Sequence, residues 1–156
     1  MKKITISLLL ALTVIAITAV PVSAAKGDNP ANDKPNNLYL YEKDSNWDIV
    51  WDGAWGKLTT NKAGNVKFNG KRIEPGCEYA LIVYTDPWPG DPITIIGTDV
   101  ANKGGNVNIK GELGPVTGVK IWLVPADDVT ETGMTAWNPA EYLFEHNLFT
   151  IPDPDA

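Results

Sequence analysis

The part of the chain best suited to contact a ligand is the proline-rich segment 86–92. Trp88 lies there between two prolines, with Asp86 and Asp91 on either side. Prolines lack the N–H that a strand inside a sheet requires, so we expect a loop. An indole ring on a rigid loop can stack on a sugar ring or fill a pocket of a protein partner. Trp88, Asp86 and Asp91 are therefore candidate ligand-binding residues; the alternative is that Trp88 folds back and seals the end of the core.

A second candidate site is a short acidic segment with oxygen-bearing side chains at alternate positions. Asp44, Asn46 and Asp48 have the spacing that begins a calcium-binding loop, and Asp52 could add a further oxygen ligand. The segment lacks the glycine and the glutamate that an EF-hand loop requires further along. Calcium is the only cofactor that the sequence suggests, and the alternative is a polar turn between two strands.

The residue inventory argues against nucleophilic catalysis. Ser45 is the only serine after residue 25, and His146 is the only histidine. A catalytic triad needs a nucleophile, a base and an orienting group together, and nothing in the sequence pairs His146 with Ser45 or Cys77. We therefore predict no enzyme and no catalytic residues. An Asp/Glu-dependent hydrolase is the alternative that 19 acidic residues leave open.

The single cysteine, Cys77, has two interpretations. A free thiol usually behaves as a small buried apolar residue, and we favour this interpretation. A lone cysteine in an exported protein can also form an intermolecular disulfide, which is the alternative. One cysteine and one histidine exclude a metal site built from several thiolates or imidazoles.

Length and composition indicate one acidic domain with a hydrophobic core. The chain has 156 residues, of which 44% are hydrophobic. Thirteen Lys and Arg are outnumbered by 19 Asp and Glu, and the formal net charge is −6. Phosphate backbones are bound by clustered basic residues, so nucleic acid is not an expected partner.

The N-terminal segment has the pattern of a secretory signal peptide. Two lysines precede an apolar run over residues 4–20, and Pro21 and four small or aliphatic residues follow. Cleavage after Ala24 or Ala25 removes residues 1–25, whereas an uncleaved membrane anchor is the alternative. We therefore expect a secreted protein, outside the cell or at its surface, with no membrane span after cleavage.

The rest of the chain predicts an all-β domain. Residues 26–36 hold no large apolar side chain and are expected to be a flexible spacer, and residues 37–156 form the domain. Short β-prone runs separated by Gly, Pro, Asn and Asp predict a sandwich or barrel. These runs cover residues 38–41, 49–51, 55–60, 66–68, 79–85, 93–96, 107–109 and 119–124.

An internal repeat divides much of the domain into two similar hairpin units, 56–85 and 97–126. Asn61–Gly70 aligns with Asn102–Gly111 at an offset of 41 residues, and six of ten positions are identical. Both segments contain an Asn-Lys-x-Gly-Asn sequence, in which the glycine and asparagines suit the positive φ of a hairpin turn.

Two further motifs refine the fold. The segment 73–81, with Pro-Gly four residues before Tyr79, resembles the tyrosine corner of fibronectin and immunoglobulin-like domains, so we predict a Greek-key β-sandwich. Asn138 followed by Pro139 resembles a helix start. We expect at most one short helix near residues 138–147, with a final strand after it.

An ordered set of short motifs covers nearly all of the domain: Gly53–Gly56, Pro75–Tyr79, Asp86–Gly90, Ala101–Val107, Lys120–Val124, Trp137–Pro139 and Tyr142–Glu145. The set resembles a group of uncharacterised secreted β-sandwich proteins, mainly of archaea. That resemblance implies a location outside the cytoplasm and no particular chemistry.

The leading functional hypothesis is a secreted, non-enzymatic binding or structural module that acts at the cell surface or outside the cell. The alternative is a carbohydrate-binding module that uses exposed Trp, with or without calcium. The partner is then a polysaccharide, or a protein of the cell envelope. An exposed aromatic pair flanked by Asp and Asn would favour the alternative, and two carboxylates in one cleft would favour the hydrolase.

Overall fold

The structure is a computed structural model that describes residues 37–61 and 63–153. The predicted signal peptide 1–25 and the spacer 26–36 lie outside the described residues. The described chain is all-β, as predicted, and its strand pairs are antiparallel. The strands are β1 (Asn37–Tyr41), β2 (Trp55–Thr60), β3 (Asn65–Lys71), β4 (Glu78–Tyr84), β5 (Thr94–Val100), β6 (Val107–Glu112), β7 (Val116–Pro125), β8 (Val129–Thr130), β9 (Gly133–Met134), β10 (Leu143–Glu145) and β11 (Phe149–Ile151).

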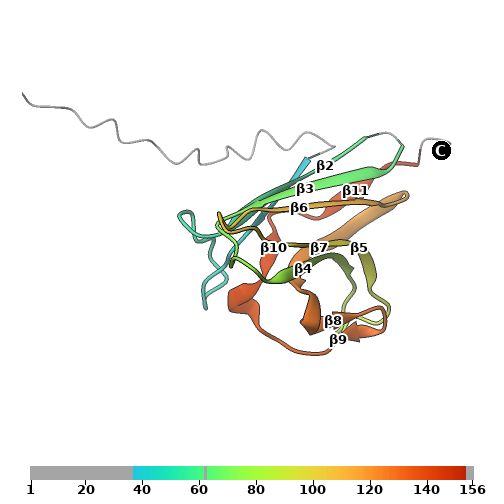
Figure 1. Cartoon of the computed structure of the whole chain (residues 1–156). Coiled ribbons are helices and arrows are strands. Elements are labelled where there is room, and N and C mark those ends of the chain that lie inside the picture. The colour runs from blue at the N-terminus through green and yellow to red at the C-terminus, as the bar shows by residue number, and fades with distance from the viewer. Residues whose placement is uncertain (1–36, 62, 154–156) are drawn as a thin grey trace, which may run out of the picture.

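The main sheet folds round until its outer strands meet. Its order is β5-β4-β7-β10-β1-β2-β3-β6, and β11 pairs with β7 beside this path. The outer strands β5 and β6 come so close that a Cβ added at Gly111 would lie 2.0 Å from the carbonyl oxygen of Ile96. Only glycine permits this approach, because any side chain would clash with backbone. Figure 1 shows β2, β3 and β6 in the upper part of the resulting barrel-like sandwich and β4 and β5 below them. The Greek-key, immunoglobulin-like arrangement stays a prediction.

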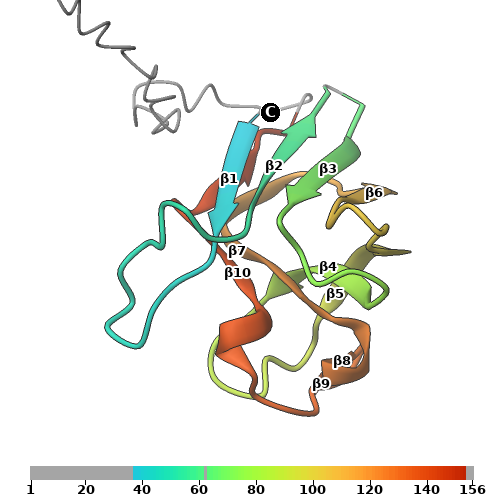
Figure 2. The ribbon, with the colours of Figure 1, turned by 60° about the vertical axis from the view of Figure 1, so that its left-hand side comes forward.

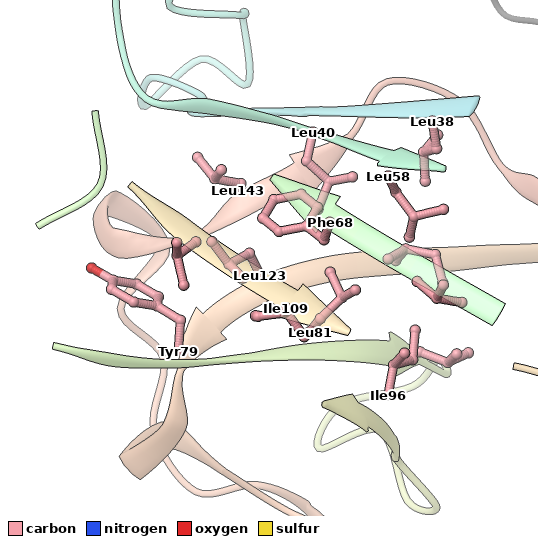
Figure 3. Close-up of a cluster of buried hydrophobic side chains, with 14 of the residues drawn as sticks. Leu38, Leu40, Leu58, Phe68, Tyr79, Leu81, Ile96, Ile109, Leu123 and Leu143 are labelled. Carbon is pink, nitrogen blue, oxygen red and sulfur yellow. The ribbon is translucent and has the colours of Figure 1, made fainter. Parts of the chain in front are cut away.

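The interior of the sandwich is filled by alternate side chains of both layers. Leu40 and Leu58 point inward from β1 and β2, Phe68 from β3, and Leu81 and Leu123 from β4 and β7. Because successive side chains of a strand point to opposite faces, their neighbours lie on the outer face. Figure 3 shows the inward set meeting between the layers.

A second apolar layer covers the outer face of β4, β7 and β10. Ile82, Trp122 and Phe144 are neighbours in the register of these strands and point away from the interior. The segment 126–142, which includes the β8–β9 hairpin, packs over part of this face, as the lower part of Figure 2 shows. The rest of the face is left for the cleft described below.

The repeat has a structural counterpart in two turns with the same hydrogen bonds. Asn61 Oδ1 accepts from the backbone N–H of Ala63 and Asn65, at 3.0 Å each. Asn102 Oδ1 accepts in the same way from Gly104, at 2.9 Å, and Asn106, at 3.1 Å. Strands β3 and β6, which carry the matching sequences, also pair with each other, so the two copies lie side by side.

Within residues 37–61 and 63–153, helical structure is limited to two single 3₁₀ turns, η2 (Ala126–Asp128) and η3 (Pro139–Glu141). The second begins at Pro139, directly after Asn138, as the sequence predicts, and β10 and β11 come after it. The short helical turn predicted near residues 138–147 is present as η3, whereas η2 carried no sequence signal. A three-residue turn has no hydrophobic period by which it could be recognised in the sequence.

The expected strand at 49–51 is wrong. These residues belong to the loop 42–54, which joins β1 to β2 and makes only one isolated bridge, between Lys43 and Ile49. Figure 2 shows this loop, in teal, extending away from the sheet at the left. The tryptophans of this loop, Trp47 and Trp51, are exposed and line hollows on the protein surface.

The corner residue Tyr79 is buried at the start of β4, with its ring in the core. Burial raises the pKa of its hydroxyl to about 12, and a hydrogen bond from the backbone of Glu74 opposes this rise. A bond to backbone five residues upstream is the contact that defines a tyrosine corner.

Candidate functional site

A cleft of about 870 Å³ opens on the outer face of β4, β7 and β10. Three segments that are far apart in the sequence border it: the loop 42–54, the loop 85–92 and the stretch around Trp137. The cleft therefore lies over the part of the second apolar layer that the segment 126–142 leaves uncovered, between that segment and the two loops.

The floor of the cleft consists of aromatic rings from three neighbouring strands. Trp122 of β7 stacks on Tyr84 of β4, with 3.8 Å between ring centroids and 11° between ring planes. Phe144 of β10 meets Trp122 edge to face at 5.2 Å. Strand alternation alone places these side chains on one face, so the floor is fixed by the sheet and not by loop packing.

The walls consist of three exposed tryptophans. Trp47, Trp88 and Trp137 are 53%, 48% and 44% exposed. Trp88 stands nearly perpendicular to Trp137, at 5.5 Å and 81°, and Trp47 lies 6.2 Å from Trp137 at 34°. Exposed indoles of this number on one small area are unusual for a surface that contacts only water.

Trp88 is a surface residue, as the ligand-binding hypothesis requires. Its loop is closed by a bond from Gly90 N–H to the Pro87 carbonyl and is anchored to β9 by a bond from Met134 N–H to the Pro89 carbonyl, both 2.8 Å. Together with its prolines, these bonds hold the indole outward.

The two acidic neighbours of Trp88 differ in position. Asp86 lines the cleft and forms an ion pair with Lys120 of β7. Asp91 is exposed and is not among the residues that line the cleft. The structure therefore brings Trp88 and Asp86 together and leaves Asp91 apart.

Trp137 is positioned by a buried polar network below it. Asp128 is 7% exposed, and its Oδ2 accepts from Tyr142 Oη at 2.8 Å and from Asn138 Nδ2 at 2.9 Å. The Tyr142 hydroxyl also accepts from the backbone N–H of Asn138 at 3.1 Å. Burial, and to a smaller extent the neighbouring Asp128, raises the pKa of the Tyr142 hydroxyl well above its usual range. The network thus holds Asn138, the residue after Trp137, through both its backbone N–H and its side chain.

Trp47 lies in the loop 42–54, which is stabilised by hydrogen bonds between its own residues. Asp44 Oδ1 accepts from the backbone N–H of Asn46 at 2.8 Å and of Asp48 at 3.0 Å. Trp47 itself has a φ of 67°, in the left-handed region that is costly for a bulky residue. Backbone strain of this kind persists where the surrounding structure over-determines it, and it concentrates at functional sites.

The same contacts bear on the calcium hypothesis. Asp44, Asn46, Asp48 and Asp52 all lie in the loop 42–54, but Asp44 serves there as a turn cap through one of its oxygens. Within the described residues, no group of three or more His, Cys, Asp or Glu could hold a metal ion. These hydrogen bonds are those of a polar turn, which is the alternative to a calcium site for this segment.

Two buried polar atoms meet at the base of the cleft. The indole nitrogen Nε1 of Trp122, a residue 7% exposed, and the carboxylate oxygen Oε2 of Glu145 have no hydrogen-bond partner within the described chain. Burial raises the pKa of the Glu145 carboxyl above its ordinary value of 4.5, and the nearby Trp122 N–H opposes the rise. The two groups are thus close neighbours: the Trp122 N–H acts on the Glu145 carboxyl strongly enough to oppose the rise of its pKa, although neither atom has a well-formed hydrogen bond. Leaving each unpaired costs about 1–3 kcal/mol.

Two lysines complete the cleft. Lys43 Nζ lies 6.0 Å from the ring centroid of Trp47 and 5.9 Å from that of Phe144, and Lys120 Nζ lies 5.9 Å from that of Tyr84. Both positive charges favour the ionised form of Glu145. With Asp86 and Glu145 they give the cleft two charges of each sign, so its formal charge is balanced.

Sequence reasoning missed most of this site. Trp122, Trp137 and Glu145 belong to motifs of the ordered set, but nothing in those motifs indicates a binding role for them. Trp47, Trp51 and Trp55 recur every four residues, but they do not share a strand: the first two lie in the loop and only Trp55 belongs to β2.

The interpretation of Cys77 as a buried thiol is wrong. The residue is exposed and is a free cysteine in this structure. It immediately precedes β4, where the chain turns out of the corner and the side chain faces solvent.

Comparisons with protein-family models, with curated proteins and with solved structures find no match for this chain. The resemblance to secreted archaeal proteins therefore stays a prediction. Among the described residues, no helix is long and apolar enough to cross a membrane.

Proposed function

We propose that the protein is an exported, non-enzymatic module that binds a neutral carbohydrate in the cleft between Trp47, Trp88 and Trp137. The observation that carries this proposal is the unpaired donor and acceptor at the base, Trp122 Nε1 and Glu145 Oε2. A sugar hydroxyl accepts one hydrogen bond and donates another, so a hydroxyl that reaches the base of the cleft can pair with the donor, with the acceptor or with both.

The aromatic walls supply the other half of sugar recognition. The flat apolar face of a pyranose ring stacks on an indole, while its rim of hydroxyls needs donors and acceptors. Three exposed indoles surround the site, and Asp86 and Lys43 lie at its border to bond peripheral hydroxyls. Tryptophan loses little rotamer entropy when it is covered, so such a surface binds at low cost.

Two other ligand classes that use aromatic clefts fit less well. A quaternary ammonium ion would meet Lys43 and Lys120, whose charges already lie near three of the rings, and it offers no acceptor to Trp122. A proline-rich peptide offers carbonyl acceptors to the indole N–H, but its prolines have no donor for Glu145. A hydroxyl-rich ligand meets both requirements.

The charge of the protein favours a neutral glycan over an acidic one. The chain carries a formal net charge of −6, which repels polyanions at low ionic strength. The cleft adds no positive excess to offset this repulsion, because its two lysines are matched by two carboxylates. Uronic-acid and sulfated polysaccharides are therefore disfavoured.

A hydrolase is the second candidate, because Asp86 and Glu145 line the same cleft. A carboxyl with a raised pKa beside an ionised one is the arrangement of a glycosidase. Asp86 is, however, ion-paired with Lys120, which occupies the carboxylate that would act as nucleophile or base. Release of reducing ends from a polysaccharide by the wild type and not by Glu145→Gln would establish this candidate.

Affinity electrophoresis tests the proposal. The protein is run in native gels that contain hydroxyethylcellulose, xylan, galactomannan, amylopectin or glycol chitin. We expect retardation in at least one gel, and its loss in Trp88→Ala. Leu148→Ala is the matched control, since Leu148 is an exposed apolar residue outside the cleft. Equal mobility in all five gels, or retardation that Trp88→Ala leaves unchanged, would contradict carbohydrate binding at this site.

A further inference from the structure

A second hollow lies beside the cleft and continues it. It has a volume of about 480 Å³ and is bordered by Lys43, Trp47, Asp48, Ile49 and Trp51. Lys43 and Trp47 border the first cleft as well. Trp47 therefore forms a ridge that both hollows share, and together they make a longer groove than one sugar ring needs.

The far wall of the second hollow is Trp51. Its side chain is 55% exposed, and its ring rests edge to face on Tyr41 of β1, at 5.6 Å and 61°. This contact holds the indole on the sheet and leaves its other side to solvent. Trp51 thus has the environment of the cleft tryptophans, although it lies outside the cleft.

The loop that carries both indoles is ordered before any ligand arrives. Glu42 fastens its two ends, because Glu42 Oε2 accepts from Ala54 N–H and Glu42 N–H donates to the Ala54 carbonyl, at 2.9 Å each. Gly53 N–H donates to the Val50 carbonyl at 2.9 Å. A preordered loop loses little conformational entropy on binding, and the strained φ of Trp47 fixes the direction of the shared ridge.

Polar groups of the second hollow suit the same ligand chemistry as the cleft. Lys43 donates and Asp48 accepts. Because Lys43 borders both hollows, the whole groove holds two lysines and three carboxylates, and it has no positive excess that would favour an acidic glycan. Indole rings beside polar side chains repeat the arrangement of the first cleft. The hollow is therefore suited to a second unit of the same neutral chain.

We infer that the Trp47–Trp51 hollow is a second sugar subsite, so that the protein binds the interior or end of a neutral glycan chain of several units and not a single sugar. This inference rests on the proposed function of the cleft. It predicts that affinity increases with chain length until the chain covers both hollows and then stays constant. Trp51 contributes only to ligands long enough to reach it.

Isothermal titration with oligosaccharides of one to six units tests the inference, using the cello-, xylo-, manno-, malto- and chito- series. For the wild type we expect affinity to rise with length within one series. Trp51→Ala should weaken binding of the longest member by about three- to tenfold, as loss of one stacked aromatic ring does, and leave the shortest binding member unchanged. Trp88→Ala should weaken short and long members alike.

Each other outcome has a definite meaning. Equal wild-type affinity for the shortest and longest member, or a Trp51→Ala effect independent of length, overturns the second subsite and leaves the cleft in place. No binding in any series overturns the proposed function, and the second subsite with it. Leu148→Ala, which removes an exposed apolar side chain elsewhere, controls for loss of apolar surface, and circular dichroism confirms that each variant is folded.

Discussion

Replacing Glu145 with Gln should weaken ligand binding and raise stability at neutral pH at the same time. Gln keeps the shape of the side chain but removes the charge. A hydrogen bond to a charged group contributes about 1.5–3 kcal/mol, so loss of the charge-assisted part predicts an affinity lower by about tenfold or more. Oε2 of the half-buried Glu145 has no hydrogen-bond partner in the described chain, and burial raises the pKa of this carboxyl, so its charge lowers the stability of the folded state.

The pH dependence of stability has a definite sign. Burial raises the pKa of Glu145 above 4.5 in the folded state, so the folded protein binds this proton more tightly than the unfolded chain does. The stabilising contribution is complete below the ordinary pKa of Glu and is lost as pH rises through the folded pKa. Above that value the ionised group lowers the free energy of unfolding, and Glu145→Gln should remove this loss.

Urea denaturation from pH 4 to pH 8, paired with titration of the ligand over the same range, measures both effects. Wild-type affinity should fall as the pH decreases through the raised pKa, because protonation removes the carboxylate acceptor. Glu145→Gln should show a flatter profile in both experiments. A variant that is less stable than wild type at neutral pH and binds with unchanged affinity would refute the reasoning.

Three further substitutions test how the site is built. Trp88→Ala should change the free energy of unfolding by at most about 1 kcal/mol, because the side chain is 48% exposed, and a calorimetric loss of the 3–5 kcal/mol expected of a buried aromatic would show that it seals the core. Tyr142→Phe removes a hydroxyl that contacts Asp128, and should destabilise the protein by about 1–3 kcal/mol and also weaken ligand binding through Trp137; binding that stays intact would separate the network from the site. Tyr79→Phe should cost about 1–2 kcal/mol and leave binding unchanged, and an unaltered denaturation midpoint would remove the corner assignment.

The parts of the fold that follow from local sequence were predictable. The Asn-Lys-x-Gly-Asn segments form equivalent turns, because an asparagine side chain bonding to the backbone and a glycine at positive φ are local requirements. The alternation of β4 and β7 likewise follows from period-two patterning. The strand expected at 49–51 failed because exposed tryptophans have the same β propensity as buried ones.

The candidate site depends on contacts that no local pattern encodes. Trp88 could be nominated because its prolines mark a loop, and the structure places it in the cleft. Trp122 and Glu145 come together only because β7 and β10 are neighbours in the sheet, although they are 23 positions apart in the chain. Trp47 joins them through a loop whose course depends on hydrogen bonds of Asp44 and Glu42. Strand order and loop path are long-range properties, so single-sequence reasoning could not supply them.

The indole N–H signal of Trp122 in a ¹H–¹⁵N NMR spectrum tests the central claim most directly. The chain has six tryptophans, and each contributes one such signal. On addition of the oligosaccharide that binds most tightly, the Trp122 signal should move, because its unpaired Nε1 acquires a hydroxyl acceptor. Signals of the wall residues Trp47, Trp88 and Trp137 should move with it. A saturating ligand that leaves the Trp122 signal in place would contradict the account, and so would the absence of any indole shift with all five sugar series.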